Sequence, residues 1–329
     1  MATIIDVAQR AGVSIKTVSR VLNREPHVRD AVRQKVLEAV EALGYRPNQS
    51  ARRMAGRKSF LVAYLYSNPS PAYTTAVQSG AARCCRELGH HLVVEPVLPE
   101  DEDLSPVIDR LVSTLAPDLL LVAPPISDDA DFLALVERKG TPLVRIAGVV
   151  PGPGKVISVD DREAAYRMTR YLIGMGHRRI GVVRPPEDHL SARARFDGFV
   201  DAMEEAGLPF DPACLAPGRF TFESGKSAAA RLLARAERPT AIFATNDEMA
   251  LGVLAQAHDM GLSLPQDLSV AGFDDIPATR TCWPLLTTIR QPLEELGRLA
   301  IIEGIGGTDA PRPVLDYRLV ERDSVARIG

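Results

Sequence analysis

Seven apolar segments recur along residues 59–274, and amphipathic stretches of 12–18 residues separate them. Each segment is short and rich in Val, Ile, Leu and Ala, which is typical of strands buried on both faces of a parallel sheet. The segments are 59–66, 91–97, 117–124, 142–148, 178–185, 240–246 and 268–274. A stretch rich in Pro and Gly at 148–156 interrupts the series near its middle. The alternation predicts a doubly wound α/β body.

The first 43 residues carry helical periodicity instead. Thr3 is placed to cap a first helix, and Gly12 is placed to end it in a sharp turn. Ser14 then caps a second helix, in which Val18 and Val21 are spaced to pack inward. A third helix over about 30–43 repeats apolar residues at Val32, Val36, Val40 and Leu43. The pattern predicts an all-α head with a helix-turn-helix.

The opposite side of the second predicted helix carries Ile15, Lys16, Ser19 and Arg20. A helix-turn-helix lays the N-terminal residues of its second helix in the major groove of DNA. Lys16 and Arg20 can donate to guanine O6 and N7, and Ile15 can contact a thymine methyl group. A generic three-helix bundle is the alternative, but it leaves Ile15 exposed without purpose. We therefore interpret this face as a DNA-reading face.

The segment after the third helix predicts one more, very short helix. Pro47 ends the third helix, Asn48 caps the next one and Gly56 ends it. An isolated helix shorter than about 12–15 residues is marginal in water, so we expect this one to fold only against a partner chain and DNA. Arg52 and Arg53 would contact phosphates, and Met54 would wedge into a minor-groove step. A disordered basic linker is the equally supported alternative.

Charge divides the chain in the same way. The net charge is −3, but residues 1–60 carry twelve Lys and Arg against five Asp and Glu, whereas the remainder carries 27 against 37. A basic head on an acidic body indicates that the head binds a polyanion, although a solvated charged face would give the same count.

The sequence shows no sign of export, of a membrane span or of a metal site. The N-terminus lacks the features of a signal peptide, and no window has the apolar length of a membrane span, so we expect a cytoplasmic, nucleoid-associated protein. The four cysteines show no metal-ligand spacing, so we expect reduced thiols, no metal and no cofactor.

Two long stretches, "TIIDVAQRAGVSIKTVSRVLN" and "VRQKVLEAVEALGYRPNQSARRMAGR", resemble the DNA-binding head and hinge of the lactose-repressor (LacI/GalR) family of bacterial transcription regulators. The resemblance continues through "VDDREAAYRMTRYLIGMGHRRIG", "TAIFATNDEMALGVL", "DLSVAGFDD" and "LLTTIRQP", and so covers nearly all 329 residues. It implies a periplasmic-binding-protein-like body of two similar doubly wound subdomains, linked by three crossovers, with a ligand between them. It also implies a homodimer whose hinge helices insert a leucine into the operator centre. Met54 takes that place here, which leaves open whether the preferred central base step changes.

The resemblance to the family sets the expected domains and DNA contacts. Residues 1–47 are the helix-turn-helix domain, 48–58 the hinge helix and linker, and 59–329 the two-lobed effector-binding and dimerisation domain. The expected DNA contacts are Ser14, Ile15, Lys16, Thr17, Ser19, Arg20, Asn23, His27, Asn48, Arg52 and Met54.

Five positions match effector-pocket positions of the family: Tyr73, Arg195, Phe220, Asn246 and Asp274. A forked donor, an amide and an acceptor carboxylate suit the adjacent hydroxyls of a sugar. Phe220 offers an apolar wall to a pyranose or to a base. Ordinary alternatives are a salt bridge for Arg195 and Asp274, a helix cap for Asn246 and a core position for Phe220.

Asp161 and Trp283 are weaker effector candidates, and Arg193 competes with Arg195 as the clamp.

The sequence motifs of common enzyme classes are incomplete or absent. Gly225, Lys226 and Ser227 end like a P-loop, yet the position five before Gly225 is Phe220 instead of glycine. The sequence "GMGHRRIG" has Arg179 where a dinucleotide fingerprint needs its third glycine. No GxSxG or HExxH occurs, so we expect no enzyme.

We therefore expect a ligand-responsive DNA-binding regulator, a dimeric repressor of carbohydrate-utilisation genes released by a sugar. The alternatives are a purine-dependent or other metabolite-dependent co-repressed regulator and a free-standing solute-binding protein.

Overall fold

The computed structural model describes residues 2–22, 28–45, 58–67, 70–98, 103–187, 189–306 and 315–328. They fall into two compact units, Met1–Ser59 and Phe60–Gly329. The expected hinge, residues 48–58, lies outside the described residues except for Lys58.

The N-terminal unit contains three helices, α1 (Ile4–Ala11), α2 (Ile15–Leu22) and α3 (Asp30–Ala42). Thr3 caps α1 in a reciprocal capping box, in which its hydroxyl accepts from the Asp6 N–H and the Asp6 carboxylate accepts from the Thr3 N–H. Gly12 ends α1 with a φ of 66°, a left-handed conformation that glycine adopts without a Cβ clash. The buried side chains of Val7, Val18 and Val36, one from each helix, meet in the core. The predicted helix-turn-helix head is confirmed.

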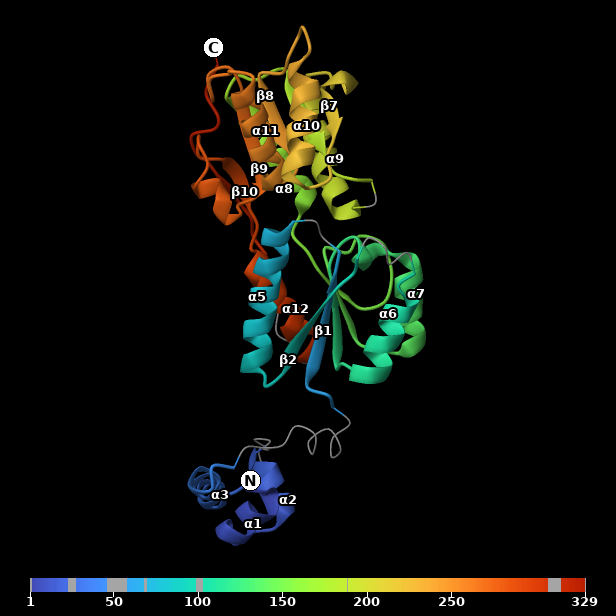
Figure 1. The fold of residues 1–329 in the computed structure, drawn as a ribbon, viewed down its shortest axis with the longest axis vertical. Coiled ribbons are helices and arrows are strands. Elements are labelled where there is room, and N and C mark those ends of the chain that lie inside the picture. Colours follow the sequence, from blue (N-terminus) through green and yellow to red (C-terminus); the bar gives the residue numbers. More distant parts are fainter. Residues whose placement is uncertain are drawn as a thin grey trace. The chain divides into compact units, whose positions relative to one another are not determined.

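The C-terminal unit contains two lobes, each built on one sheet (Figure 1). The first lobe has a five-stranded parallel sheet in the order β2-β1-β3-β4-β5. Its strands are β1 (Leu61–Tyr66), β2 (His91–Pro96), β3 (Leu119–Val122), β4 (Leu143–Ile146) and β5 (Lys155–Ile157). Its helices are α5 (Pro71–Glu87), α6 (Ser105–Arg110), α7 (Ala130–Lys139) and α12 (Leu293–Ile305).

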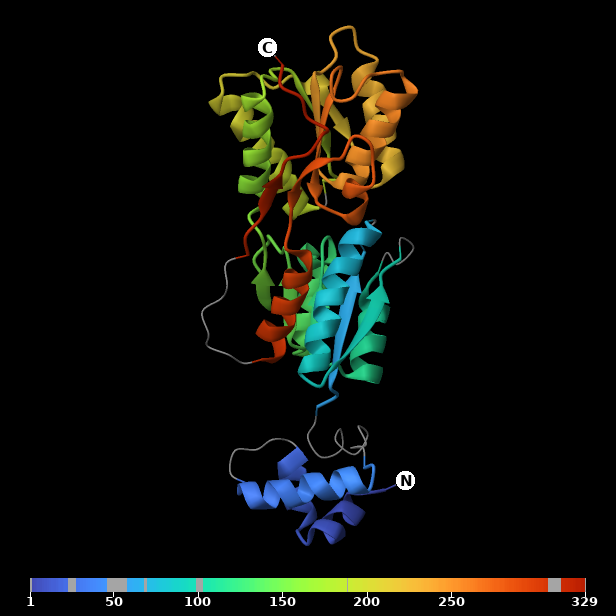
Figure 2. The same cartoon turned by 90° about the vertical axis from the view of Figure 1, so that its left-hand side faces the viewer.

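Side-chain alternation along the strands of the first lobe builds two cores, one on each face of the sheet. Val62 and Tyr64 of β1 pack under α5 and α12, which lie side by side in Figure 2. Ala63 and Leu65 of the same strand pack with α6 and α7 on the other face. A strand apolar on both faces is what the uninterrupted apolar segments of the sequence predict.

The second lobe repeats this plan with a six-stranded sheet in the order β11-β10-β9-β8-β6-β7. Only β11 runs antiparallel to its neighbour among the described strands. The strands are β6 (Ile180–Arg184), β7 (Leu215–Pro217), β8 (Ala241–Ala244), β9 (Ser269–Asp274), β10 (Thr287–Arg290) and β11 (Arg318–Val320). The helices α8 (Asp161–Gly174) and α9 (Leu190–Glu205) cover one face, and α10 (Phe222–Leu233) and α11 (Asp247–Asp259) cover the other.

The chain passes between the lobes three times, after β5, after β10 and after α12. The helix α12 therefore belongs to the first lobe although strands of the second lobe precede and follow it. This arrangement confirms the two doubly wound subdomains and the three crossovers. Within the described ranges, no helix has the length and apolar character that a membrane crossing requires.

Candidate effector-binding and DNA-binding sites

The second helix of the head separates its residues by burial as predicted. Val18 and Val21 are buried, whereas Lys16 and Arg20 are exposed and Ile15 is 47% exposed. The Ser14 hydroxyl accepts a hydrogen bond from the Thr17 N–H at 3.1 Å and so caps the helix. The helix thus presents basic and apolar side chains to solvent in its first two turns, where a recognition helix contacts bases.

Five expected DNA contacts lie outside the described residues: Asn23, His27, Asn48, Arg52 and Met54. The minor-groove wedge at Met54 therefore stays a prediction.

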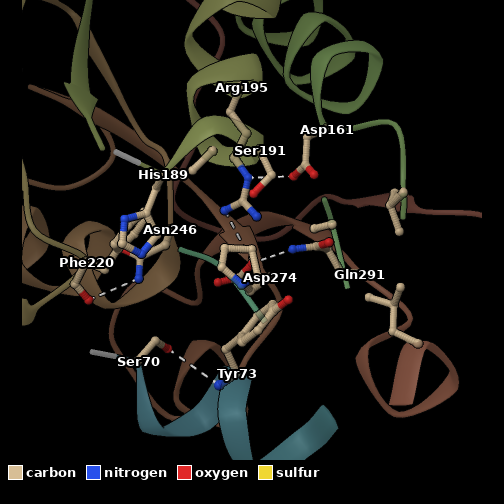
Figure 3. A pocket seen from close by; sticks show the side chains of 15 residues that line it. Ser70, Tyr73, Asp161, His189, Ser191, Arg195, Phe220, Asn246, Asp274 and Gln291 are labelled. Carbon is tan, nitrogen blue, oxygen red and sulfur yellow. Dashed lines mark hydrogen bonds and ion pairs between the residues drawn. The ribbon is translucent and has the colours of Figure 1, made fainter. Parts of the chain in front are cut away.

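The five expected effector contacts come together in a pocket between the two lobes (Figure 3). Tyr73, Arg195, Phe220, Asn246 and Asp274 all line it. The pocket lies at the carboxyl ends of the second lobe's parallel strands, where open α/β sheets bind ligands.

Arg195 stands at the centre of the polar lining. Its Nε donates to Asp161 Oδ1 and its Nη1 donates to the Thr245 carbonyl, both at 2.7 Å. The same Nη1 lies 3.6 Å from Asp274 Oδ1, and the guanidinium carbon lies 3.9 Å from the centroid of the Phe273 ring. The side chain comes from α9, and only 7% of the residue is exposed. Two carboxylates and an aromatic face therefore fix one guanidinium at the pocket wall.

Asp274 ends β9 and accepts a hydrogen bond from Gln291 Nε2 at 2.7 Å. Burial raises the pKa of its carboxyl to about 6, although the Arg195 charge and the Gln291 hydrogen bond oppose the rise. Burial likewise raises the pKa of Asp161, and Arg195 opposes this rise as well. The two carboxyls share one arginine, so the site holds more acid than base.

Backbone strain gathers at the same place. Ala147, Phe220 and Asp274 line the pocket with φ angles of 51°, 61° and 120°, in a region that L-residues rarely adopt. Such conformations cost about 1–3 kcal/mol each and cluster at ligand sites. The Phe220 ring lies against the His189 ring, with centroids 4.9 Å apart and planes tilted by 57°.

Asn246 and Tyr73 lie at the N-terminal ends of two helices at the pocket. Asn246 Oδ1 accepts from the Met249 N–H at 3.0 Å and caps α11, while its Nδ2 donates to the Phe220 carbonyl at 3.1 Å. The helix-cap interpretation of Asn246 is therefore correct, and the cap lies at the pocket wall. Tyr73 is in the first turn of α5, where burial and then the Asp161 and Asp274 charges raise its phenol pKa.

Of the weaker effector candidates, only Asp161 lines the pocket. Asp161 lines the pocket as the nearest partner of Arg195. Arg193 is exposed and is not among the lining residues, so it does not compete with Arg195. Trp283 is 85% exposed and also lies outside the pocket lining.

Sequence reasoning missed four polar residues of the lining: Ser70, His189, Ser191 and Gln291. Ser70 and His189 immediately precede the helices α5 and α9, and Gln291 directly follows β10. The sequence could have indicated them as polar residues next to the end of a helix or strand, but only after that helix or strand had been recognised.

A helix-turn-helix head joined to a two-lobed body with a polar pocket between its lobes defines a class of proteins, the DNA-binding regulators that respond to a small molecule. Residues 3–48 match the model of the bacterial regulatory proteins of the lacI family, and residues 169–325 match that of the periplasmic binding protein-like domain.

Full-length comparisons agree with these two matches. The chain is 32% identical over 303 residues to the HTH-type transcriptional repressor CytR of Escherichia coli (strain K12), covering 92% of this chain and 88% of CytR. Among solved structures, the lac repressor dimer bound to operator and the anti-inducer ONPF is 27% identical with a TM-score of 0.81, covering 99% of each chain. The regulator CelR in complex with cellobiose is 28% identical with a TM-score of 0.73, covering 98% of this chain and 100% of CelR.

The chain therefore belongs to the lacI family, and it is a ligand-responsive, DNA-binding transcriptional regulator.

Proposed function

We propose that this protein is a dimeric repressor of carbohydrate-utilisation genes and that an uncharged sugar in the interlobe pocket releases it from its operator. The observation that carries the proposal is the group of Arg195, Asp161 and Asp274 at the pocket wall. A guanidinium between two carboxylates offers donors and acceptors side by side. Adjacent sugar hydroxyls, each both donor and acceptor, match such a set.

The charge of the lining favours an uncharged ligand. Among the described residues that line the pocket, Arg195 is the only Lys or Arg, and two carboxylates already face it. A phosphorylated or carboxylated ligand would meet these carboxylates without a spare cation, which costs free energy in a buried site. Apolar side chains from the first lobe, Val159 and Leu296, also line the pocket.

The structural neighbour CelR, solved with cellobiose, supports a sugar as the ligand class. The lac repressor dimer bound to operator supports two heads acting on two half-sites. In such a dimer, an effector that binds one arrangement of the lobes better than another shifts the equilibrium between the operator-bound and released states.

A thermal-shift screen of the full-length protein tests the ligand class. The screen uses monosaccharides, disaccharides, sugar phosphates and purine bases, and a ligand at 100 times its dissociation constant stabilises the folded protein by about 2.7 kcal/mol. We expect a hit among the uncharged sugars, and the same sugar should release operator DNA in a fluorescence anisotropy titration. A purine hit without a sugar hit would replace the sugar proposal by co-repression through a base stacked on Phe220.

A further inference from the structure

The N-terminus of α5 is completed by a side chain from the other lobe. Within its own lobe, the Ser70 hydroxyl accepts from the Tyr73 N–H at 3.5 Å, and the Ser70 carbonyl accepts from the Thr74 N–H at 3.2 Å. Pro71 at the start of the helix has no N–H to satisfy. Among the first-turn N–H groups of α5, that of Ala72 therefore still needs an acceptor.

Glu248 supplies the missing acceptor across the pocket. The Ser70 hydroxyl donates to Glu248 Oε1 at 3.0 Å, and the Ala72 N–H faces the same carboxylate and lowers its pKa. Glu248 lies in the first turn of α11, in the second lobe, while α5 runs to the junction with that lobe (Figure 1). The Glu248 carboxylate thus joins α11 to the start of α5 through Ser70, which is 178 residues away in the sequence.

The position of this carboxylate also balances the helix charges. The N-termini of α5 and α11 both lie at the junction, and each carries about half a positive elementary charge. Two such ends repel one another when the lobes approach, and a carboxylate between them is attracted to both. Burial raises the pKa of Glu248, whereas the hydrogen bonds from Ser70 and Ala72 oppose the rise.

The two helices joined here also carry pocket residues. Ser70 and Tyr73 belong to the start of α5, and Asn246 caps α11, and all three line the pocket. Glu248 itself is not among the lining residues. Any movement that opens the pocket by separating α5 from α11 must therefore break the hydrogen bonds of Glu248.

We propose that Glu248 is a positioning residue that latches the two lobes across the effector pocket by capping α5 from α11. The link of this latch to effector binding rests on the proposed function. The latch itself is independent of the effector's identity, so it is tested on the ligand-free full-length protein.

Amide hydrogen exchange read by mass spectrometry provides the test. Glu248→Ala should raise exchange by at least about 10-fold in the first turn of α5, which corresponds to losing hydrogen bonds to a charged acceptor. Because the latch joins the lobes, exchange should also rise elsewhere on the pocket wall, at the Gln291 N–H, which donates to the Asp274 carbonyl at 3.3 Å. Glu248→Gln retains an acceptor and should show a smaller rise in both places. Asp131→Asn, at an exposed aspartate in the first turn of α7, is the matched control and should change neither.

The outcomes separate a latch from a local cap. A rise confined to α5 would show that Glu248 caps one helix without holding the lobes, and no rise in either place would remove its cap as well. Either result overturns the latch and leaves the sugar proposal standing, because the ligand screen does not depend on Glu248. A failed ligand screen would likewise leave the exchange result intact.

Discussion

Each lobe of the body buries one arginine among the residues described, and the two arginines have different tasks. In the first lobe, Arg145 is 1% exposed, and it donates from Nε to the Ser127 carbonyl and from Nη2 to the Val150 carbonyl, both at 2.7 Å. Its Nη2 also donates to Asp128 Oδ1 at 3.1 Å. Asp128 Oδ1 in turn accepts from the N–H groups of Val149 and Val150. Arg145 therefore holds the loop after β4 in place.

The loop is shaped to fit this side chain. A Cβ at Gly148 would lie 2.8 Å from Arg145 Nη2, and a Cβ at Gly152 would lie 3.1 Å from its Nη1. At Gly148 the guanidinium fills the space that a Cβ would take, and at Gly152 a Cβ would lie tightly against both Arg145 and Leu133 Cδ1, the latter at 3.0 Å. Arg195 in the second lobe makes similar bonds, but it faces a pocket. Burial and ion pairing alone therefore do not identify a ligand site, whereas an adjoining cavity and strained backbone do.

Removing each arginine in turn should separate their roles most strongly. Arg145→Leu leaves Asp128 as a buried charge without its cation, so the free energy of unfolding should fall by about 3–5 kcal/mol in urea denaturation. Arg195→Leu should cost less, because burial already raises the pKa of Asp161 and of Asp274, so these carboxyls can bind a proton once the cation is gone. Equal losses for the two variants would contradict the distinction between a structural and a ligand-facing arginine.

The pH dependence of stability tests the surroundings of Asp274. Its pKa of about 6 lies above the ordinary 3.8 because of burial. Between these values the folded protein binds more protons than the unfolded chain, so this group's contribution to stability falls as pH rises from about 4 to 6. Asp274→Asn removes that contribution. The free energy of unfolding of the variant minus that of the wild type should therefore rise across this window by up to about 3 kcal/mol and then level off. A flat difference would show that Asp274 is well solvated.

Ligand binding should distinguish Arg195 from Arg193, which lies on the same helix. Arg195→Ala and Asp274→Ala should each weaken binding of the sugar identified in the screen by about 1.5–3 kcal/mol, since each removes a hydrogen bond to a charged group. Arg193→Ala is the matched control, because Arg193 is on the same helix but exposed. Isothermal titration calorimetry measures all three. Operator binding without sugar should be preserved, and an unchanged sugar affinity in Asp274→Ala would exclude this carboxylate from the site.

The strands that the sequence predicts and those that it misses differ in composition. All seven predicted strands are present, because fully buried strands need unbroken apolar runs. The missed strands are β5, β7, β10 and β11. Three of them have only three residues, and β10 reads Thr-Thr-Ile-Arg. The three-residue strands are too short to show a pattern. The strand β10 is buried over its first three residues although it contains two threonines, because their hydroxyls are paired: Thr287 donates to the Arg322 carbonyl and Thr288 donates to Asp247 Oδ1.

The pocket shows the same limit. Arg195 and Asp274 could be expected because family motifs surround them, whereas Gln291 follows a strand whose sequence does not announce it. Its contact with Asp274 arises only when β9 and β10 pair side by side. Asp161 and Glu248 likewise act through partners 34 and 178 residues away, a separation that local sequence patterns do not encode.

The exposed basic side chains of the head complete the comparison. Lys16 and Arg20 are exposed on α2, where DNA can desolvate them. Lys16→Ala and Arg20→Ala should each weaken operator binding by about 1–3 kcal/mol and should weaken binding to random DNA less, because base contacts carry sequence information and phosphate contacts do not. Fluorescence anisotropy at one fixed salt concentration measures both affinities. Arg10→Ala, in the last turn of α1, is the control for general loss of positive charge from the head. Equal losses on operator and random DNA would show that Lys16 and Arg20 contact phosphates, and the head would then read bases through other residues of the same helix.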